Sequence, residues 1–170
     1  DVEQLPTHGG SLRIYGCHAK DTHVSTQAVG SLIAEEAQRG LQTLATYQNF
    51  QARADKVKDD LLSFLLKQKR AGKKVAAYGA AAKGNTLLNY AGVKPDLLPF
   101  VCDAAPAKQG KYMPGSHIPI LPPKALATSA LDYALILPWN IAAEVKRQNA
   151  MLVAQGTKFV TAVPQLDIFN

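Results

Sequence analysis

The stretch Lys74–Thr86 reads KVAAYGAAAKGNT, and it decides the fold class. Its first part, Lys74–Gly79, is a short apolar run that ends in glycine, which predicts a buried strand. Apolar side chains at helical spacing predict a helix from Gly84 to Ala91, with Gly92 near its end. A strand that passes through a turn of small residues into a helix is typical of a Rossmann-like unit. The sequence therefore predicts an α/β domain.

The same alternation of strands and helices continues toward the C-terminus. Further strands are predicted over Leu98–Asp103, Tyr133–Leu137 and Lys158–Val163, helices over Pro122–Thr128 and Asn140–Ala154, and a Gly/Pro/Lys-rich loop over Ala104–Leu121. Short strand–helix alternation implies right-handed crossovers and a parallel sheet. We expect a Rossmann-like parallel sheet of at least four strands between residues 73 and 163, flanked by helices.

A long helical segment precedes this domain. The helical pattern begins near Thr26, which like Ser25 suits the N-cap, and continues to Arg70, with an interruption expected at Gly40. In its second half, apolar side chains recur every three or four residues, at Phe50, Ala54, Val57, Leu61 and Phe64. This stripe predicts an amphipathic helix over residues 41–70 that packs on the sheet.

The N-terminal residues do not resemble the start of a free-standing domain. Ser11–Cys17 (SLRIYGC) alternates apolar and polar side chains after a turn at Gly9-Gly10, which predicts a half-buried strand. Such a strand needs partners, and none of the next fifty residues offers one. We therefore expect its sheet to lie upstream, and the chain to be part of a longer protein. No basic and apolar leader opens the sequence, so we expect a cytoplasmic location.

The composition excludes several classes of protein. The chain has 170 residues, of which 47% are hydrophobic and 19% charged, as in a globular domain. No apolar run approaches the roughly 20 residues of a membrane-spanning helix, so no membrane partner is expected. Two cysteines rule out a disulfide scaffold and a four-cysteine zinc site, and both Cys17 and Cys102 are expected to be buried thiols. The four histidines, at positions 8, 18, 23 and 117, lack metal-binding spacing, so no metal site is expected.

The net charge of +6 does not indicate nucleic-acid binding. Lysines and arginines are scattered, and the densest group, between Lys67 and Lys74, lies at a predicted helix end where cations favour the helix dipole. No nucleic-acid partner is expected. The excess charge remains suited to attracting a small anionic ligand.

The turn between the first strand and its helix is the main candidate site. Gly79–Gly84 reads G-x-A-x-x-G, with Ala81 where a dinucleotide fingerprint has its middle glycine. Small side chains from Ala80 to Ala82 would let a phosphate approach the backbone, and the helix start would supply donors. Asp103 ends the next strand 19 residues after Gly84, near the spacing of a ribose-binding acid. A tight turn without a ligand is the alternative interpretation.

Three other features bear on this site. The Walker pattern is broken because Asn85 follows the second glycine where a lysine should stand, which argues against ATP hydrolysis. Lys108, Lys111 and Tyr112 are expected above the carboxyl ends of the strands, where such sheets bind ligands. Trp139, followed by a helix-capping Asn140, is placed either to stack on a base or sugar or to fill the core.

Four motifs in order resemble one family over nearly the whole chain. They are THGGSLR at Thr7–Arg13, YGAAAKGNTLLNYAGV at Tyr78–Val93, D-x-x-P-x-K-Q-G-x-x-x-P-G-x-x-I-P at Asp103–Pro119, and LPWN at Leu137–Asn140. Together they resemble the C-terminal region of S-adenosylmethionine-dependent sugar C-methyltransferases. That family makes branched deoxysugars on nucleoside diphosphate carriers.

The resemblance implies a domain organisation and a division of labour. Residues 1–23 would close the sheet of the methyltransferase core, residues 24–72 would form a helical connector, and residues 73–170 would bind the nucleotide sugar. The methyl-donor site and the zinc cysteines of the family are not in this chain, and its proton-removing residues lie mainly upstream. The chain alone is therefore expected to bind no S-adenosylmethionine and to be inactive.

The resemblance also implies site residues. A nucleoside-diphosphate sugar, of the thymidine diphosphate type, would be held by Gly79, Ala80, Ala81, Ala82, Lys83, Gly84, Asn85, Asp103, Lys108, Gly110, Trp139 and Asn140. His8 and Arg13, at the junction with the upstream core, are candidates to reach the sugar. Two alternatives stay open from the residues alone, a dinucleotide-dependent oxidoreductase and a regulatory Rossmann domain.

Overall fold

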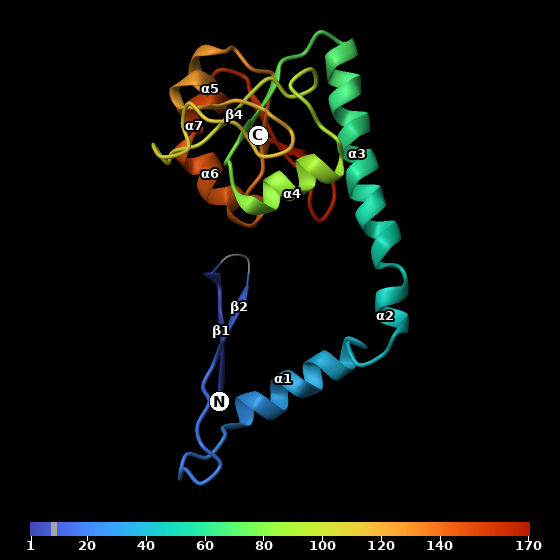
Figure 1. Ribbon diagram of the computed structural model, residues 1–170, viewed down its shortest axis with the longest axis vertical. Helices are drawn as coiled ribbons and strands as arrows, with labels where there is room; N and C mark the ends of the chain where they lie inside the picture. The colour runs from blue at the N-terminus through green and yellow to red at the C-terminus, as the bar shows by residue number, and fades with distance from the viewer. Residues whose placement is uncertain (8–9) are drawn as a thin grey trace. The chain divides into compact units, whose positions relative to one another are not determined.

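The structure is a computed structural model that describes residues 1–7 and 10–170. Its chain falls into two units, Asp1–Arg53 and Ala54–Asn170 (Figure 1). Helix α3, Phe50–Arg70, begins at the end of the first unit and continues into the second. The domain boundaries expected from the sequence, after residues 23 and 72, stay predictions.

The first unit opens with a hairpin. Strands β1, Val2–Leu5, and β2, Ser11–Ile14, pair antiparallel from Val2 opposite Ile14 to Leu5 opposite Ser11. The partner of the Ser11–Cys17 strand lies on its N-terminal side, as expected, but within this chain, and the strand is shorter than expected. Residues 2–5 escaped detection because four residues with apolar side chains only at the two ends show no strand periodicity.

Two helices complete the first unit, α1, Gln27–Gln38, and α2, Ala45–Gln48. Thr26 caps α1, since its hydroxyl oxygen accepts a hydrogen bond from the N–H of Ala28, and Gly40 follows the helix end with φ of +74°. Both features were predicted. Cys17 is exposed and not buried as expected, because it lies beyond the end of β2 in a unit without a core of its own.

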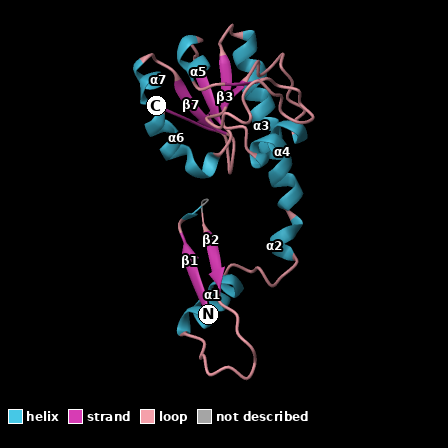
Figure 2. Cartoon of the chain, turned by 60° about the vertical axis from the view of Figure 1, so that its left-hand side comes forward, coloured by secondary structure: helices cyan, strands magenta, loops and turns pink. Residues whose placement is uncertain are grey.

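The second unit contains a six-stranded sheet with the order β5-β4-β3-β6-β7-β8 (Figure 2). The strands are β3, Val75–Tyr78; β4, Val101–Cys102; β5, Ile120–Leu121; β6, Tyr133–Ile136; β7, Lys158–Thr161; and β8, Asp167–Phe169. All neighbours pair parallel except β7 and β8. The predicted Rossmann-like parallel sheet is confirmed.

Helices cover both faces of this sheet. They are α3 and α4, Ala82–Tyr90, on one face, and α5, Lys124–Thr128, α6, Ala142–Gln148, and α7, Ala150–Ala154, on the other. The first face buries Leu61, Phe64 and Leu65 of α3 with Leu87 and Leu88 of α4, and the second buries Leu126, Val145 and Leu152. A strand buried on both faces carries a continuous apolar run, which is why Lys74–Gly79 was recognisable.

Some elements differ from their predicted extents. Phe50, the first residue of the predicted apolar stripe, is exposed, so the stripe packs only from about Val57 onward. Strand β5 lies inside the predicted loop, and β8 was not expected. The predicted helix Asn140–Ala154 is divided into a 3₁₀ turn, Trp139–Ile141, followed by α6 and α7. The break falls at Asn149, whose side-chain amide donates to the carbonyl of Val145 and so competes with the helix.

Among the described residues, no helix has both the length and the apolar character needed to cross a membrane.

Candidate functional site

The turn after β3 is packed against the end of β6 at two glycines. A Cβ atom on Gly79, whose φ is +93°, would lie 2.4 Å from Cδ of Pro138. A Cβ atom on Gly84 would lie 2.5 Å from Cβ of Leu137. Such distances are below any real contact, so both positions require glycine for the close approach of the two segments. The first two residues of the LPWN motif thus fit against the two glycines of the turn.

The carboxylate of Asp103 accepts hydrogen bonds from this turn and from the loop after β4. The N–H of Ala80 donates to its Oδ2 at 2.7 Å, and the N–H of Ala105 donates to its Oδ1 at 2.8 Å. Lys108 donates from Nζ to the same Oδ2 at 3.1 Å and to the carbonyl of Ala80 at 2.9 Å. The residue is only 8% exposed. In this structure Asp103 therefore binds both loops, and the contact with a ribose hydroxyl that the spacing suggested stays a prediction.

The free donors of the turn lie at the start of α4. The N–H of Ala80 is taken by Asp103, and the N–H of Ala81 donates to the carbonyl of Gly79 at 2.8 Å. Within the described part of the chain, the N–H groups of Ala82, Lys83 and Gly84 have no acceptor. These are the first three amides of the helix, where the positive end of the dipole favours an anion. The amides of the turn that are not already engaged within the protein are thus those of residues 82–84.

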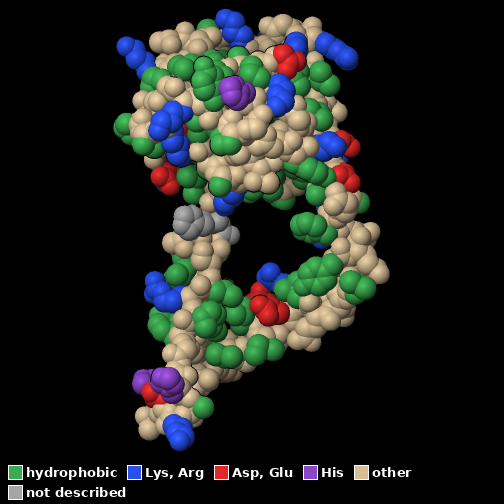
Figure 3. Space-filling model, viewed as in Figure 1, with side chains coloured by type: hydrophobic (Ala, Val, Ile, Leu, Met, Phe, Trp, Pro, Cys, Tyr) green, Lys and Arg blue, Asp and Glu red, His purple; other side chains and the backbone are tan. Residues whose placement is uncertain are grey.

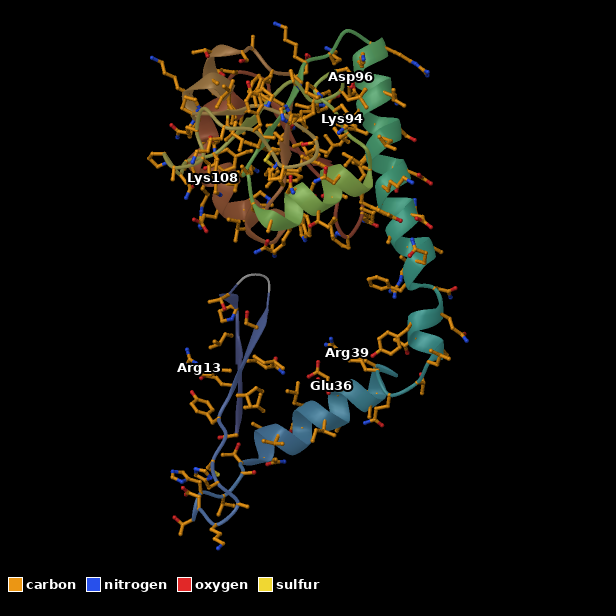
Figure 4. The ribbon with its side chains drawn as sticks, viewed as in Figure 1. Arg13, Glu36, Arg39, Lys94, Asp96 and Lys108 are labelled. Atoms are coloured by element: carbon orange, nitrogen blue, oxygen red, sulfur yellow. The ribbon has the colours of Figure 1, made fainter. Side chains whose placement is uncertain are left out.

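A cleft of about 430 Å³ opens beside this helix start. Its walls come from the turn after β3, from α4 and from the loop between β4 and β5, where Lys108 is labelled in Figure 4. The lining residues are Ala80, Ala81, Ala82, Asn85, Ala107, Lys108, Lys111, Tyr112, Met113, Pro114 and Ile120. The two lysines are its charged side chains, and Lys111 has no ion-pair partner among the described residues. Lys111 is thus the lysine of the cleft whose charge is not paired, since Lys108 is paired with Asp103.

The remaining predicted site residues lie beside the cleft and do not line it. Lys83 donates to Oδ1 of Asn140 at 2.8 Å, and its ammonium lies 5.7 Å from the ring centroid of Trp139. Trp139 also packs against the core. Gly110 forms a turn with φ of +74° and donates its N–H to the carbonyl of Ile120. The structure joins Trp139 and Asn140 to the turn through Lys83.

Two ionisable side chains near the site are perturbed by burial. Burial raises the pKa of the Cys102 thiol to about 11, and its Sγ donates to the carbonyl of Pro122. Cys102 is thus the buried thiol that was expected. Burial also raises the pKa of Tyr78, and the neighbouring carboxylate of Asp103 adds to the effect. Both groups stay protonated and neutral near pH 7, so neither supplies a nucleophile there.

The junction candidates belong to the first unit. Arg13 on β2, labelled in Figure 4, forms an ion pair with Glu3 on β1 at 3.0 Å, and Tyr15 donates to the same carboxylate at 2.9 Å. These contacts tie the two strands together. His8 lies outside the described residues. Over residues 1–7 and 10–170, no group of three histidine, cysteine or acidic side chains is arranged to hold a metal ion.

The charge of the second unit is dispersed. In the view of Figure 3, Lys and Arg side chains lie singly around the unit and do not form a continuous patch. Several of them are paired, among them Lys69 with Asp96 and Lys73 with Asp132. On the face drawn in Figure 3, the described basic side chains therefore form no extended basic surface.

Sequence reasoning missed part of the cleft wall. Ala107, Met113, Pro114 and Ile120 were not identified as lining residues. Met113 and Ile120 are buried, and Tyr112 in the same loop forms a bridge to Pro119. The one available signal was the proline and glycine content of the loop, which indicates turns but not which side chains face a ligand.

Comparison with known proteins identifies the family of this chain. The C-methyltransferase C-terminal domain matches residues 6–164. The C-methyltransferase NovU of Streptomyces niveus is 34% identical over 165 residues, which are 97% of this chain and 39% of that protein. The chain thus spans about two fifths of the length of this relative. UDP-D-quinovosamine 4-dehydrogenase from Vibrio fischeri aligns with a TM-score of 0.42 and 24% identity, over 55% of this chain and 79% of that one.

The motifs from Tyr78 to Asn140 that meet around the turn after β3 all lie within the matched residues. The match covers nearly the whole chain, from before the hairpin strand β2 to the end of β7. This chain therefore belongs to the family of C-methyltransferase C-terminal domains.

Proposed function

We propose that the cleft beside α4 holds the diphosphate of a nucleoside-diphosphate sugar, of the thymidine diphosphate type. The observation that carries the proposal is the set of three free amides at Ala82, Lys83 and Gly84, beside a cleft with Lys108 and Lys111. Phosphate oxygens accept hydrogen bonds from such amides and gain from the helix dipole. The two ammonium groups add attraction that salt screens.

The domain would serve a methyltransferase by holding its substrate. The relative NovU is named a C-methyltransferase, and most of its length lies outside the region matched by this chain. We assign the methyl donor, S-adenosylmethionine, and the proton-removing residues to that further part. The deoxysugar bound through its diphosphate would be presented to them.

The cleft itself does not suit the methyl donor. S-adenosylmethionine carries a sulfonium cation, whereas the helix start and two lysines favour negative charge. We therefore expect calorimetric titration of this chain with S-adenosylmethionine to show no saturable binding. A saturable site would assign the donor to this chain and overturn the division of labour.

The first unit has exposed apolar side chains that suit packing against a methyltransferase core. Ile14, Val24 and Ile33 are more than half exposed, although they are large apolar side chains. Exposed apolar groups of this kind mark surfaces that other protein segments cover. We propose that the methyltransferase core covers them.

The diphosphate proposal is tested by removing one amide. Ala82 is the first residue of α4, where proline is well tolerated, and Ala81 before it already has the extended conformation that proline requires. Ala82→Pro should therefore leave the fold intact and weaken thymidine diphosphate about 10- to 150-fold, the value of a hydrogen bond to a charged group. Calorimetric titration measures the affinity.

The matched control is Gln27→Pro, which removes the first amide of α1 in the other unit. It should leave the affinity unchanged. Thermal melts of both variants establish that they are folded. If folded Ala82→Pro binds thymidine diphosphate as tightly as the unmodified chain, the start of α4 is only a tight turn.

A further inference from the structure

The cleft has one exposed aromatic wall. Tyr112 lines it next to Lys111 and is 57% exposed. Its ring lies stacked on the ring of His117, with centroids 5.0 Å apart and planes 16° from parallel. One face of the tyrosine is thus supported by a second ring, while the residue remains open to a ligand. Stacked rings of this kind can extend to a third planar group.

The backbone around this pair is fixed. The N–H of Met113 donates to the carbonyl of Ile118 at 2.8 Å, and the N–H of His117 donates to the carbonyl of Met113 at 3.0 Å. Met113 and Ile118 are buried, so they anchor the turn in the core. Because the turn is held at both ends, Tyr112 loses little conformational freedom when a ligand binds.

The turn is also attached to α4. Asn89 donates from Nδ2 to the carbonyl of Pro114 at 2.9 Å, and Lys94 donates to the carbonyl of Gly115 at 2.7 Å. The contact of Asn89 connects the aromatic wall to the helix whose first residue, Ala82, lines the cleft, and Lys94, four residues after the end of α4, adds a second contact. The anion-binding end and the aromatic wall therefore belong to one preorganised structure.

The other aromatic candidate is already engaged. Trp139 contacts Lys83 through its ring and packs against the core, and it does not line the cleft. Tyr112 is therefore the aromatic side chain that remains available to a ligand of this cleft.

We propose that Tyr112, supported by His117, is the platform on which the base of the bound nucleotide stacks. The inference rests on the proposed function, since it takes the ligand to be a nucleoside diphosphate. The phosphates bind at the start of α4 and beside Lys108, and the planar base lies on the tyrosine ring. Stacking on an aromatic side chain tolerates different bases, so the platform favours nucleotides over bare diphosphates and not one base over another.

The test compares two ligands on several variants. Thymidine diphosphate carries the base, whereas inorganic pyrophosphate carries the anion alone. Tyr112→Ala and Tyr112→Leu should each weaken thymidine diphosphate about 5- to 150-fold and change the affinity for pyrophosphate less than about two-fold. Tyr112→Phe keeps the ring and should bind both ligands like the unmodified chain. Tyr47→Ala, in the other unit, removes a half-exposed tyrosine and should change neither affinity.

The outcomes separate the two proposals. Folded Tyr112→Leu that binds thymidine diphosphate like the unmodified chain overturns the platform and leaves the diphosphate site standing. Equal losses for both ligands overturn it as well, because the ring would then act through the fold. An unmodified chain that binds neither ligand overturns the proposed function together with the platform. Loss for the nucleotide alone, with the phenylalanine variant intact, supports both.

Discussion

Single residues at the turn after β3 have roles that the sequence pattern indicated only in part. Gly84 was expected to permit close packing of a helix, and the structure places Leu137 at that contact. Gly79 was expected to permit a tight turn, and its φ of +93° with Pro138 against it agrees. Ala81, in the place of a middle glycine, is extended and uses its N–H within the turn. The glycines therefore shape the scaffold, and the ligand donors follow them.

The packing role of Gly84 predicts a loss of stability on enlargement. Gly84→Ala would place Cβ 2.5 Å from Cβ of Leu137, so one segment must shift. We expect the free energy of unfolding, measured by urea denaturation, to fall by about 1–3 kcal/mol. In a Leu137→Gly background the same change should cost less, because the Cβ atom at the closest contact is gone. Equal costs in both backgrounds would show that the contact does not explain the glycine.

At the scale of elements, two loops are joined into one structure by an acid and a lysine. Asp103 follows β4, yet it accepts from Ala80 after β3 and from Ala105 in its own loop. Lys108 donates to the carboxylate oxygen that Ala80 also uses and to the carbonyl of Ala80. The turn after β3 and the loop between β4 and β5 therefore keep the shape of the cleft jointly.

The side chains of Asp103 and Lys108 should contribute different amounts to the free energy of unfolding. Asp103→Ala leaves two backbone N–H groups without an acceptor in a buried place, so the free energy of unfolding should fall by about 2–4 kcal/mol. Lys108 is 44% exposed, so Lys108→Ala should cost about 1 kcal/mol or less. Denaturation measures both values. Hydrogen exchange at the Ala80 amide should accelerate in Asp103→Ala much more than in Lys108→Ala, and the reverse order would contradict this account.

At the scale of the whole molecule, the two units differ in how much they bury. Over residues 1–7 and 10–53, every residue is at least partly exposed, whereas residues 54–170 enclose apolar cores on both faces of the sheet. Burial of apolar surface is the dominant stabilising term in folding. The stability of this chain therefore resides in the second unit together with α3.

A truncated chain tests this distribution. Residues 50–170 retain the whole of α3 and the sheet, and should show the same Tm within a few degrees and the same affinity for thymidine diphosphate. Circular dichroism and calorimetry measure the two quantities. A truncated chain that fails to fold, or that loses the ligand, would show that residues 1–49 are needed for the stability or the site of the second unit.

The architecture of the second unit was predictable because most of its strands and helices can be recognised from short stretches of sequence. Strands β3, β6 and β7 are short apolar runs between helices, and their side chains are buried on both faces. Strands β1, β5 and β8 were not predicted, because their residues, VEQL, IL and DIF, form neither a longer apolar run nor an alternating pattern. Each is defined by the strand it pairs with, and that strand lies elsewhere in the chain.

The sequence by itself determined the α/β class, the turn from Gly79 to Gly84 as the candidate site, and the family through four ordered motifs. Tertiary structure decided which groups remain available to a ligand. It engaged the carboxylate of Asp103 and the ring of Trp139 in contacts with other loops, and it left the amides of residues 82–84 and the ring of Tyr112 open. The physical reason is that hydrogen bonds and ring contacts between loops join residues distant in sequence, which no local pattern of residue types records.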